Sequence, residues 1–138
     1  MPEKRTVKRA RKDKREGKAA STQAGEFVRE EMEHIRKGKH GARSTKQAIA
    51  IGLSKARRAG VKLAAPKKGK ASAATRKKAQ RDLAAGRSGR KHRPATKRSQ
   101  ASKRALKREG RSAASRRSLS KHARASASRR RSSGKRTR

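Results

Sequence analysis

Cysteine, tryptophan and tyrosine are absent from this chain of 138 residues, and Phe27 is its one large aromatic side chain. The lack of cysteine excludes disulfide bonds, thiolate zinc sites and cysteine nucleophiles. The lack of aromatic side chains removes the platforms on which single-stranded bases stack. If the chain binds nucleic acid, we therefore expect it to contact the backbone of a duplex rather than unpaired bases.

Long apolar segments are also missing. No apolar run reaches the roughly 18 residues of a membrane-spanning helix, and the basic N-terminus is not followed by the apolar stretch of a secretory signal. Hydrophobic residues make up 28% of the chain, and most of them are alanine, which buries little area. We therefore expect no membrane span and no globule that includes the full length.

Acidic residues are scarce, with nine Asp and Glu against 47 Lys and Arg, so the net charge is +38. The imbalance is greatest in residues 64–138, where 28 basic residues face only Asp82 and Glu109, a net charge of +26. Repulsion between like charges opposes compaction, and a polyanion would relieve it and release its own counterions. Nucleic acid is the partner that this charge predicts first, and an anionic membrane surface the second.

The large apolar residues gather between residues 22 and 63, which we interpret as the one well-specified structural unit. Val28, Met32 and Ile35 recur at helical spacing and predict a helix over residues 22–37. Glutamates in its first half and basic residues at its end match the helix dipole.

A second helix is predicted over residues 44–59. Ser44 and Gln47 have the spacing of a capping box, and Gly60 is suited to the left-handed residue that ends a helix. Small residues such as Gly52 would allow a neighbouring helix to approach closely. A hairpin of this size usually needs association to bury enough surface, so a homodimer through the hairpin, or folding on a ligand, would supply the missing burial.

The flanking segments are expected to be largely disordered. Residues 1–21 read as a mobile basic arm, and residues 64–138 as a low-complexity tail of Lys, Arg, Ala and Ser. Gly86 and Gly110 are expected to stop two of three marginal helices in this tail, which would form near residues 73–85, 99–109 and 112–127. The predicted fold class is mostly α, a small antiparallel helical hairpin flanked by largely disordered basic tails with marginal helices.

The connection between the two predicted helices is suited to holding a phosphate. Gly38 and Gly41 would let backbone approach an anion, and their spacing resembles the backbone clamp of KH domains. Lys39, Arg43 and Lys46 would supply charge at a helix N-terminus. The alternative is a polar hairpin loop in which the glycines serve only as a turn and a helix stop.

Further phosphate contacts are expected from basic residues that continue from the second helix into the tail. The sequence predicts this role for Lys55, Arg57, Arg58, Lys62, Lys67, Lys68, Lys70, Arg76, Lys77, Lys78, Arg129, Arg130 and Arg131.

Residue types that carry catalysis or bind metals are few and scattered. The histidines are His34, His40, His92 and His122. We expect them to be solvated or to face phosphate, with a metal pair of His34 and His40 as the alternative. Glutamates 30, 31 and 33 are expected to complement basic residues such as Lys46, Lys55, Arg57 and Arg58. The sequence therefore predicts no catalytic residue, metal, cofactor or small-molecule substrate, and it does not predict an enzyme.

The string FVREEMEHIRKGKHGARSTKQAIAIGLSKARRAGVKL, residues 27–63, resembles a family of small basic bacterial proteins whose shared domain has no assigned function. The resemblance continues more loosely through ATRKKAQRDL and SKRALKREGRSAAS. Members of that family are sometimes labelled DNA-binding or plasmid-stabilisation proteins, and no functional residue is established that could be carried over. The tail is also similar in composition to linker-histone tails and to bacterial histone-like proteins.

The leading hypothesis is a non-catalytic protein that binds and compacts nucleic acid, duplex DNA before RNA, with little regard to base sequence. Its expected location is cytoplasmic and nucleoid-associated. One alternative is an RNA- or ribosome-associated basic protein. Another is a helical dimerisation or plasmid-maintenance module whose basic segments are tethers.

Overall fold

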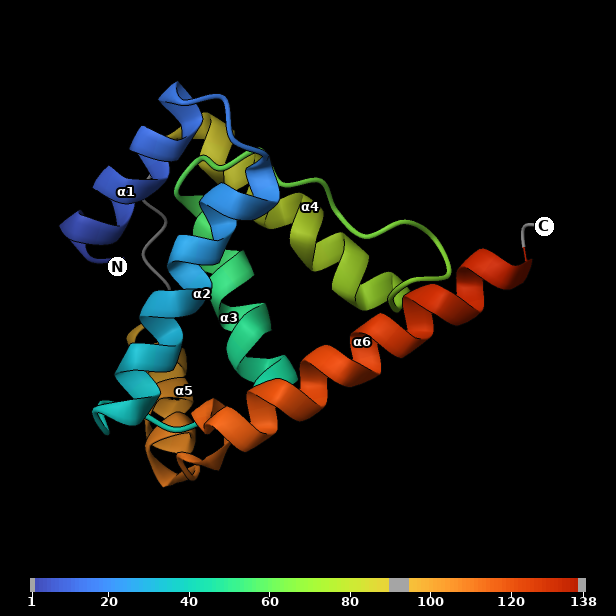
Figure 1. The fold of residues 1–138 in the computed structure, drawn as a ribbon. Helices are drawn as coiled ribbons and strands as arrows, with labels where there is room; N and C mark the ends of the chain where they lie inside the picture. The colour runs from blue at the N-terminus through green and yellow to red at the C-terminus, as the bar shows by residue number, and fades with distance from the viewer. Residues whose placement is uncertain (1, 90–94, 137–138) are drawn as a thin grey trace.

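The computed structural model describes residues 2–89 and 95–136, and helices form most of this part of the chain (Figure 1). In chain order they are α1 (Lys4–Arg15), α2 (Ala20–Arg36), α3 (Thr45–Arg58), α4 (Ala73–Ser88), α5 (Thr96–Arg108), the short 3₁₀ helix η1 (Ser112–Ala114) and α6 (Arg116–Arg136). None of the described helices is long and apolar enough to cross a membrane.

The helical hairpin predicted from the sequence is confirmed as α2 and α3, which pack against each other in the centre of Figure 1. Phe27 and Ile35 of α2 are almost completely buried. Gly52 of α3 lies so close to α2 that a Cβ atom in its place would be 2.7 Å from the Cα atom of Val28. The two backbones therefore cross at a point where only glycine fits.

The predicted ends of α3 are also confirmed. The hydroxyl oxygen of Ser44 accepts a hydrogen bond from the amide of Gln47 (3.2 Å), and the Gln47 side chain accepts one from the amide of Arg43 (2.7 Å). At the other end Gly60 has a φ of 101°, and the amide of Val61 donates to the carbonyl of Ala56 at 3.0 Å. These are the bonds of a capping box, shifted by one residue, and of a Schellman motif.

The prediction of a disordered N-terminal arm is wrong, because residues 4–15 form α1, which packs on α2. Ala10 is buried in an apolar cluster with Ala24 and Phe27. The backbone amide of Glu3 donates to a carboxylate oxygen of Glu30 at 2.9 Å and ties the start of α1 to α2. Small apolar side chains and polar contacts attach this helix to α2. The helix was not predicted because such residues do not produce a clear helical pattern of large apolar side chains in the sequence.

The prediction of a largely disordered tail is wrong as well, and the hairpin with disordered flanks is therefore not the fold. Ala113 and Ala114 of η1 are buried in a second apolar cluster with Met32 and Ile35, and Leu119 of α6 packs against it. From the sequence, a second copy of the chain or a ligand was expected to cover the apolar surface of the hairpin. In the structure, the chain's own flanking segments cover it. The first two tail helices, α4 and α5, lie within about three residues of their predicted bounds, whereas α6 begins at Arg116 and continues to Arg136, nine residues beyond the predicted end.

Gly86 does not end the helix in which it lies, as the sequence predicted, because α4 continues to Ser88. A Cβ atom at Gly86 would collide with the carbonyl oxygen of Arg57, so this glycine allows α4 to approach the end of α3. Ser54 of α3 donates to a carboxylate oxygen of Asp82 at 2.7 Å and fixes the same contact. Gly89 is the left-handed residue that follows α4, with a φ of 62°.

Candidate functional site

The few carboxylates are almost all paired with bases inside the body formed by α1 to α4. Every acidic residue except Glu109 lies within ion-pair distance of a Lys, Arg or His side chain. Four of these pairs link helices: Arg5 with Glu33 and Arg9 with Glu26 join α1 to α2, Lys55 with Glu31 joins α3 to α2, and Arg58 with Asp82 joins α3 to α4. The pKa of Glu16 lies below its ordinary value because Lys18 donates a hydrogen bond to it.

The basic residues of α5 and α6 have no such partners. Among the described side chains of these two helices, no Lys or Arg lies within ion-pair distance of a carboxylate, and most of them are exposed. No other described helix packs against α5, which contacts the α2–α3 loop instead. The last turns of α6 extend beyond the start of α4 in the view of Figure 1. Exposed bases without a described carboxylate partner also lie on α1 and α4, but they are densest along α5 and α6.

A shallow basic groove lies between the N-terminus of α3 and the side of α6, with a volume of ≈ 650 Å³. Its positive side chains are Arg43 and Lys46 beside α3, and Lys121 and Arg129 on α6. His122 and several serine hydroxyl groups also line it. The groove therefore combines four cations with a helix N-terminus, where the dipole favours an anion.

A second, smaller depression of ≈ 420 Å³ lies on the other side of η1. It is lined by three arginines, Arg36, Arg111 and Arg116, together with Ala114 and Ser115. Arg36 also donates from Nε to the carbonyl of Ala114 at 3.1 Å, which connects the end of α2 to η1. Both depressions thus present positive charge at the junction of α2, α3 and α6.

In the loop that was predicted to grip a phosphate, two backbone amides bind the chain itself. The amides of Gly41 and Ala42 donate to the carbonyls of Leu106 and Gly110, at 2.8 and 3.1 Å. A side chain at Gly41 would collide with the backbone of Glu109 and Gly110. The glycine spacing lets this internal segment approach, and no phosphate clamp of the KH type is free in the loop.

Most of the residues predicted to contact phosphate are exposed. They are Lys39, Arg43, Lys46, Arg58, Lys62, Lys67, Lys68, Lys70, Lys77, Lys78, Arg129, Arg130 and Arg131. Only Arg43, Lys46 and Arg129 of this set line the groove beside α3. Lys121 also lines the groove but was not among the predicted residues, because its position depends on how α6 packs.

Two of the predicted residues that are not exposed bind other parts of the chain. The Arg57 guanidinium donates to the carbonyls of Leu63 and Ala64 at 3.1 and 3.0 Å, and burial lowers its pKa. Lys55 binds the carboxylate of Glu31, as the sequence predicted for the glutamates of α2 and the bases of α3. Arg57 and Lys55 therefore stabilise the fold rather than offer a free cation. Arg76 is half-buried, and its Nε has no described hydrogen-bond partner.

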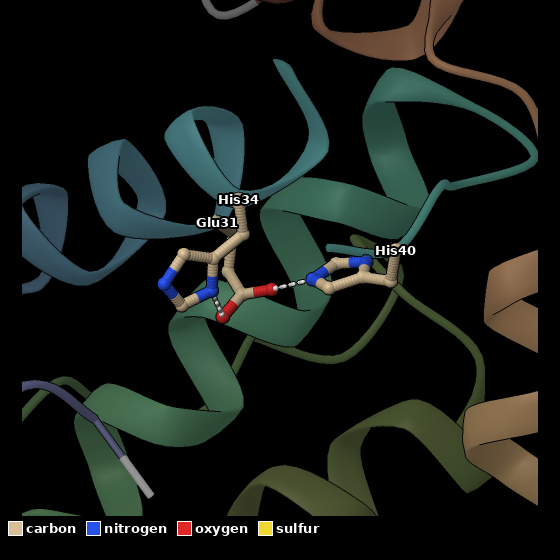
Figure 2. A group of neighbouring side chains, drawn as sticks. All are labelled: Glu31, His34 and His40. Carbon is tan, nitrogen blue, oxygen red and sulfur yellow. Dashed lines mark ion pairs between the residues drawn. The ribbon is translucent and has the colours of Figure 1, made fainter. Parts of the chain in front are cut away.

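Glu31 is also the centre of a cluster with His34 and His40, which Figure 2 shows on either side of its carboxylate. The Glu31 side chain is completely buried, and those of His34 and His40 are only 12% and 17% exposed. Oε2 of Glu31 lies 3.0 Å from Nε2 of His40, and Oε1 lies 3.9 Å from Nδ1 of His34. The two rings meet edge to face, with their centroids 6.1 Å apart.

The expectation that these two histidines are solvated or face phosphate is therefore wrong. Their proximity follows from the end of α2: the left-handed Gly38 turns the chain so that His40 comes back beside the last turns of the helix. His122 lines the basic groove, and His92 lies outside the described residues. The spacing of Glu31 and His34 by three residues was a signal in the sequence, because it places both on one helix face.

Residues 13–69 match a protein family that is described only as a family of unknown function (DUF6496). The match agrees with the resemblance of residues 27–63 to a domain without an assigned function, and it ends before α4. It carries no label of DNA binding or plasmid stabilisation. No curated protein and no solved structure matches the chain.

Proposed function

We propose that this protein binds the phosphate backbone of nucleic acid, duplex DNA in the first place, without catalysis. The observation that carries the proposal is the separation of charge, because the carboxylates are paired within the body while the bases of α5 and α6 have no described acidic partner. Exposed bases at this density bind phosphates favourably, because the counterions condensed on the nucleic acid are released when it is bound.

The shape of α6 favours a duplex. Its 21 residues correspond to about 31 Å of helix, close to the roughly 34–36 Å of one turn of B-DNA. The major groove of B-DNA admits an α-helix, whereas the chain offers only Phe27 for stacking, and that side chain is buried. We expect α6 to lie along the duplex and the groove beside α3 to hold backbone phosphates.

Binding to duplex DNA is expected to weaken steeply with salt. The test compares the wild type with a groove variant that combines Arg43→Gln, Lys46→Gln, Lys121→Gln and Arg129→Gln. Each lost phosphate contact lowers the slope of log K against log salt by about 0.9, so the groove variant should lose about 3–4 from the slope. Fluorescence anisotropy over a salt series measures it.

A matched control removes the same charge from α1 through Lys4→Gln, Lys8→Gln, Arg11→Gln and Lys14→Gln, none of which belongs to a described ion pair. Its slope should change by less than about 1. Equal losses in the two variants, or an affinity that hardly depends on salt, would contradict the proposed interface. Competition with double-stranded RNA and single-stranded DNA at one salt concentration identifies the preferred polyanion.

A further inference from the structure

Glu31, His34 and His40 have an arrangement that the binding of a polyanion does not use. Their carboxylate and imidazole groups each offer one ligand atom, and these atoms all lie within 4.8 Å of one another. The cluster lies where the α2–α3 loop folds back on α2, and none of its three residues lines the basic groove.

Hydrogen bonds on the outer side of each ring assign the two tautomers. His40 donates from Nδ1 to the carbonyl of Gly41 at 2.9 Å, because a carbonyl can only accept. His34 donates from Nε2 to the carboxylate of Glu3 at 3.0 Å, and this bond lowers the pKa of Glu3. In the neutral rings, Nε2 of His40 and Nδ1 of His34 therefore present lone pairs to Glu31.

Two lone pairs that face a buried carboxylate repel it unless a cation lies between them. Lys55 meets this need at Oε1 of Glu31, where its ammonium group binds. Oε2 is buried and accepts no hydrogen bond from any described group, although Nε2 of His40 lies 3.0 Å away. A second cation at Oε2 would give it a partner, and an unpaired buried charge is costly.

We propose that Glu31, His34 and His40 bind one divalent transition-metal ion of the zinc type. Two imidazole nitrogens and one carboxylate oxygen form a ligand set that suits Zn²⁺ and similar ions, whereas Mg²⁺ and Ca²⁺ prefer oxygen ligands alone. Glu3 and the Gly41 carbonyl then act as the outer partners that hold metal-binding histidines in position.

The ion would join α2 to the loop on which the C-terminal elements rest. His40 precedes Gly41 and Ala42, whose amides hold the carbonyls of Leu106 and Gly110. Metal bound at His40 therefore fixes the loop that supports α5 and η1. The proposal does not depend on the nucleic-acid interface, since the ligands lie outside it.

The test is a titration of the full-length, nucleic-acid-free protein with Zn²⁺ by calorimetry, and with Co²⁺ by visible absorption. We expect one ion per chain. His34→Gln and His40→Gln should each weaken binding by at least the roughly 10- to 100-fold that loss of an outer-shell partner costs. His122→Gln is the matched control and should leave the affinity unchanged. Lys55→Gln should tighten binding, because it removes a competing cation from Glu31.

A second measurement on the wild type does not depend on how the variants fold. Long-range ¹H–¹⁵N spectra report which ring nitrogen changes when Zn²⁺ is added. The expected changes are at Nδ1 of His34 and Nε2 of His40, with their outer nitrogens still protonated. Absence of Zn²⁺ binding, changes at His122 alone, or binding that survives both histidine substitutions would overturn the proposal.

Discussion

At the scale of single residues, three glycines allow two backbone segments to come close together, one within the α2–α3 hairpin and two where other segments pack against it. Gly52 faces the backbone of Val28, Gly86 faces the carbonyl of Arg57, and Gly41 faces the backbone of Glu109. At each position a methyl group would meet backbone atoms, which cannot turn aside as a flexible side chain can. The packing of α2, α4 and the segment before η1 therefore depends on these three positions.

Gly52→Ala and Gly25→Ala should have opposite effects on stability, although both replace a glycine within a helix. A Cβ atom at Gly52 would lie 2.7 Å from the Cα atom of Val28, so we expect this change to lower the free energy of unfolding by about 1–3 kcal/mol. Gly25 is exposed, with nothing within 4 Å of its Cβ position, and alanine there should stabilise α2 by about 0.5–1 kcal/mol.

Urea unfolding followed by circular dichroism measures both changes. Equal effects at the two positions would show that helix propensity alone decides them, and that the close crossing of α2 and α3 is not maintained in solution.

The residue scale also shows what the sequence can and cannot predict. Ser44, Gln47 and Gly60 were assigned correctly because a helix cap is formed by residues within one turn of it. Gly41 and Gly86 were misinterpreted because their roles depend on Glu109 and Arg57, which are distant in the chain. The cluster around Glu31 was predicted only in part, since its Lys55 contact follows from helix pairing but His40 needs the turn at Gly38.

At the scale of elements, α1 and η1 complete a core that the hairpin cannot form alone. Val7 and Ala10 of α1 cover one end of the α2–α3 pair, and Ala113 and Ala114 cover the other. Such elements escape pattern analysis because alanine counts weakly as an apolar residue. Alanine can nevertheless be completely buried where two backbones come close together, as Ala114 shows.

Ala10→Asn should release α1 from α2, whereas Arg11→Asn should not. Ala10 is 5% exposed beside apolar side chains, so an amide there would lose its water without gaining a described partner. Arg11 is exposed, and the same side chain is tolerated at such a position. Hydrogen exchange should accelerate across the amides of residues 8–15 in the first variant only. Unchanged protection in both variants would mean that α1 is held by its ion pairs alone.

At the scale of the whole molecule, a net charge of +38 acts against the fold that the apolar clusters stabilise. In most of the Lys and Arg ion pairs of the body the basic side chain is exposed, and an exposed pair contributes only about 0–1 kcal/mol. Repulsion among the many remaining bases is therefore expected to dominate the electrostatic free energy of the protein.

Raising the salt concentration should consequently raise the Tm. Between about 0.01 and 1 M salt the Debye length falls from about 30 to about 3 Å, which screens repulsion between bases that are far apart. The variants with four bases replaced by glutamine should show a smaller rise than the wild type. Thermal unfolding followed by circular dichroism provides the measurement. A Tm that falls with salt would show that the ion pairs outweigh the repulsion.

The carboxylates lie apart from many of the bases. All of them except Glu109 belong to α1–α4 and their flanking residues, while α5 and α6 contain bases alone, so the centres of negative and positive charge do not coincide. The molecule therefore has a permanent electric dipole in addition to its net charge. The field of a polyanion exerts a torque on this dipole, which turns α5 and α6 toward the polyanion before any contact forms. Encounters would then begin in the productive orientation, which raises the association rate at low ionic strength.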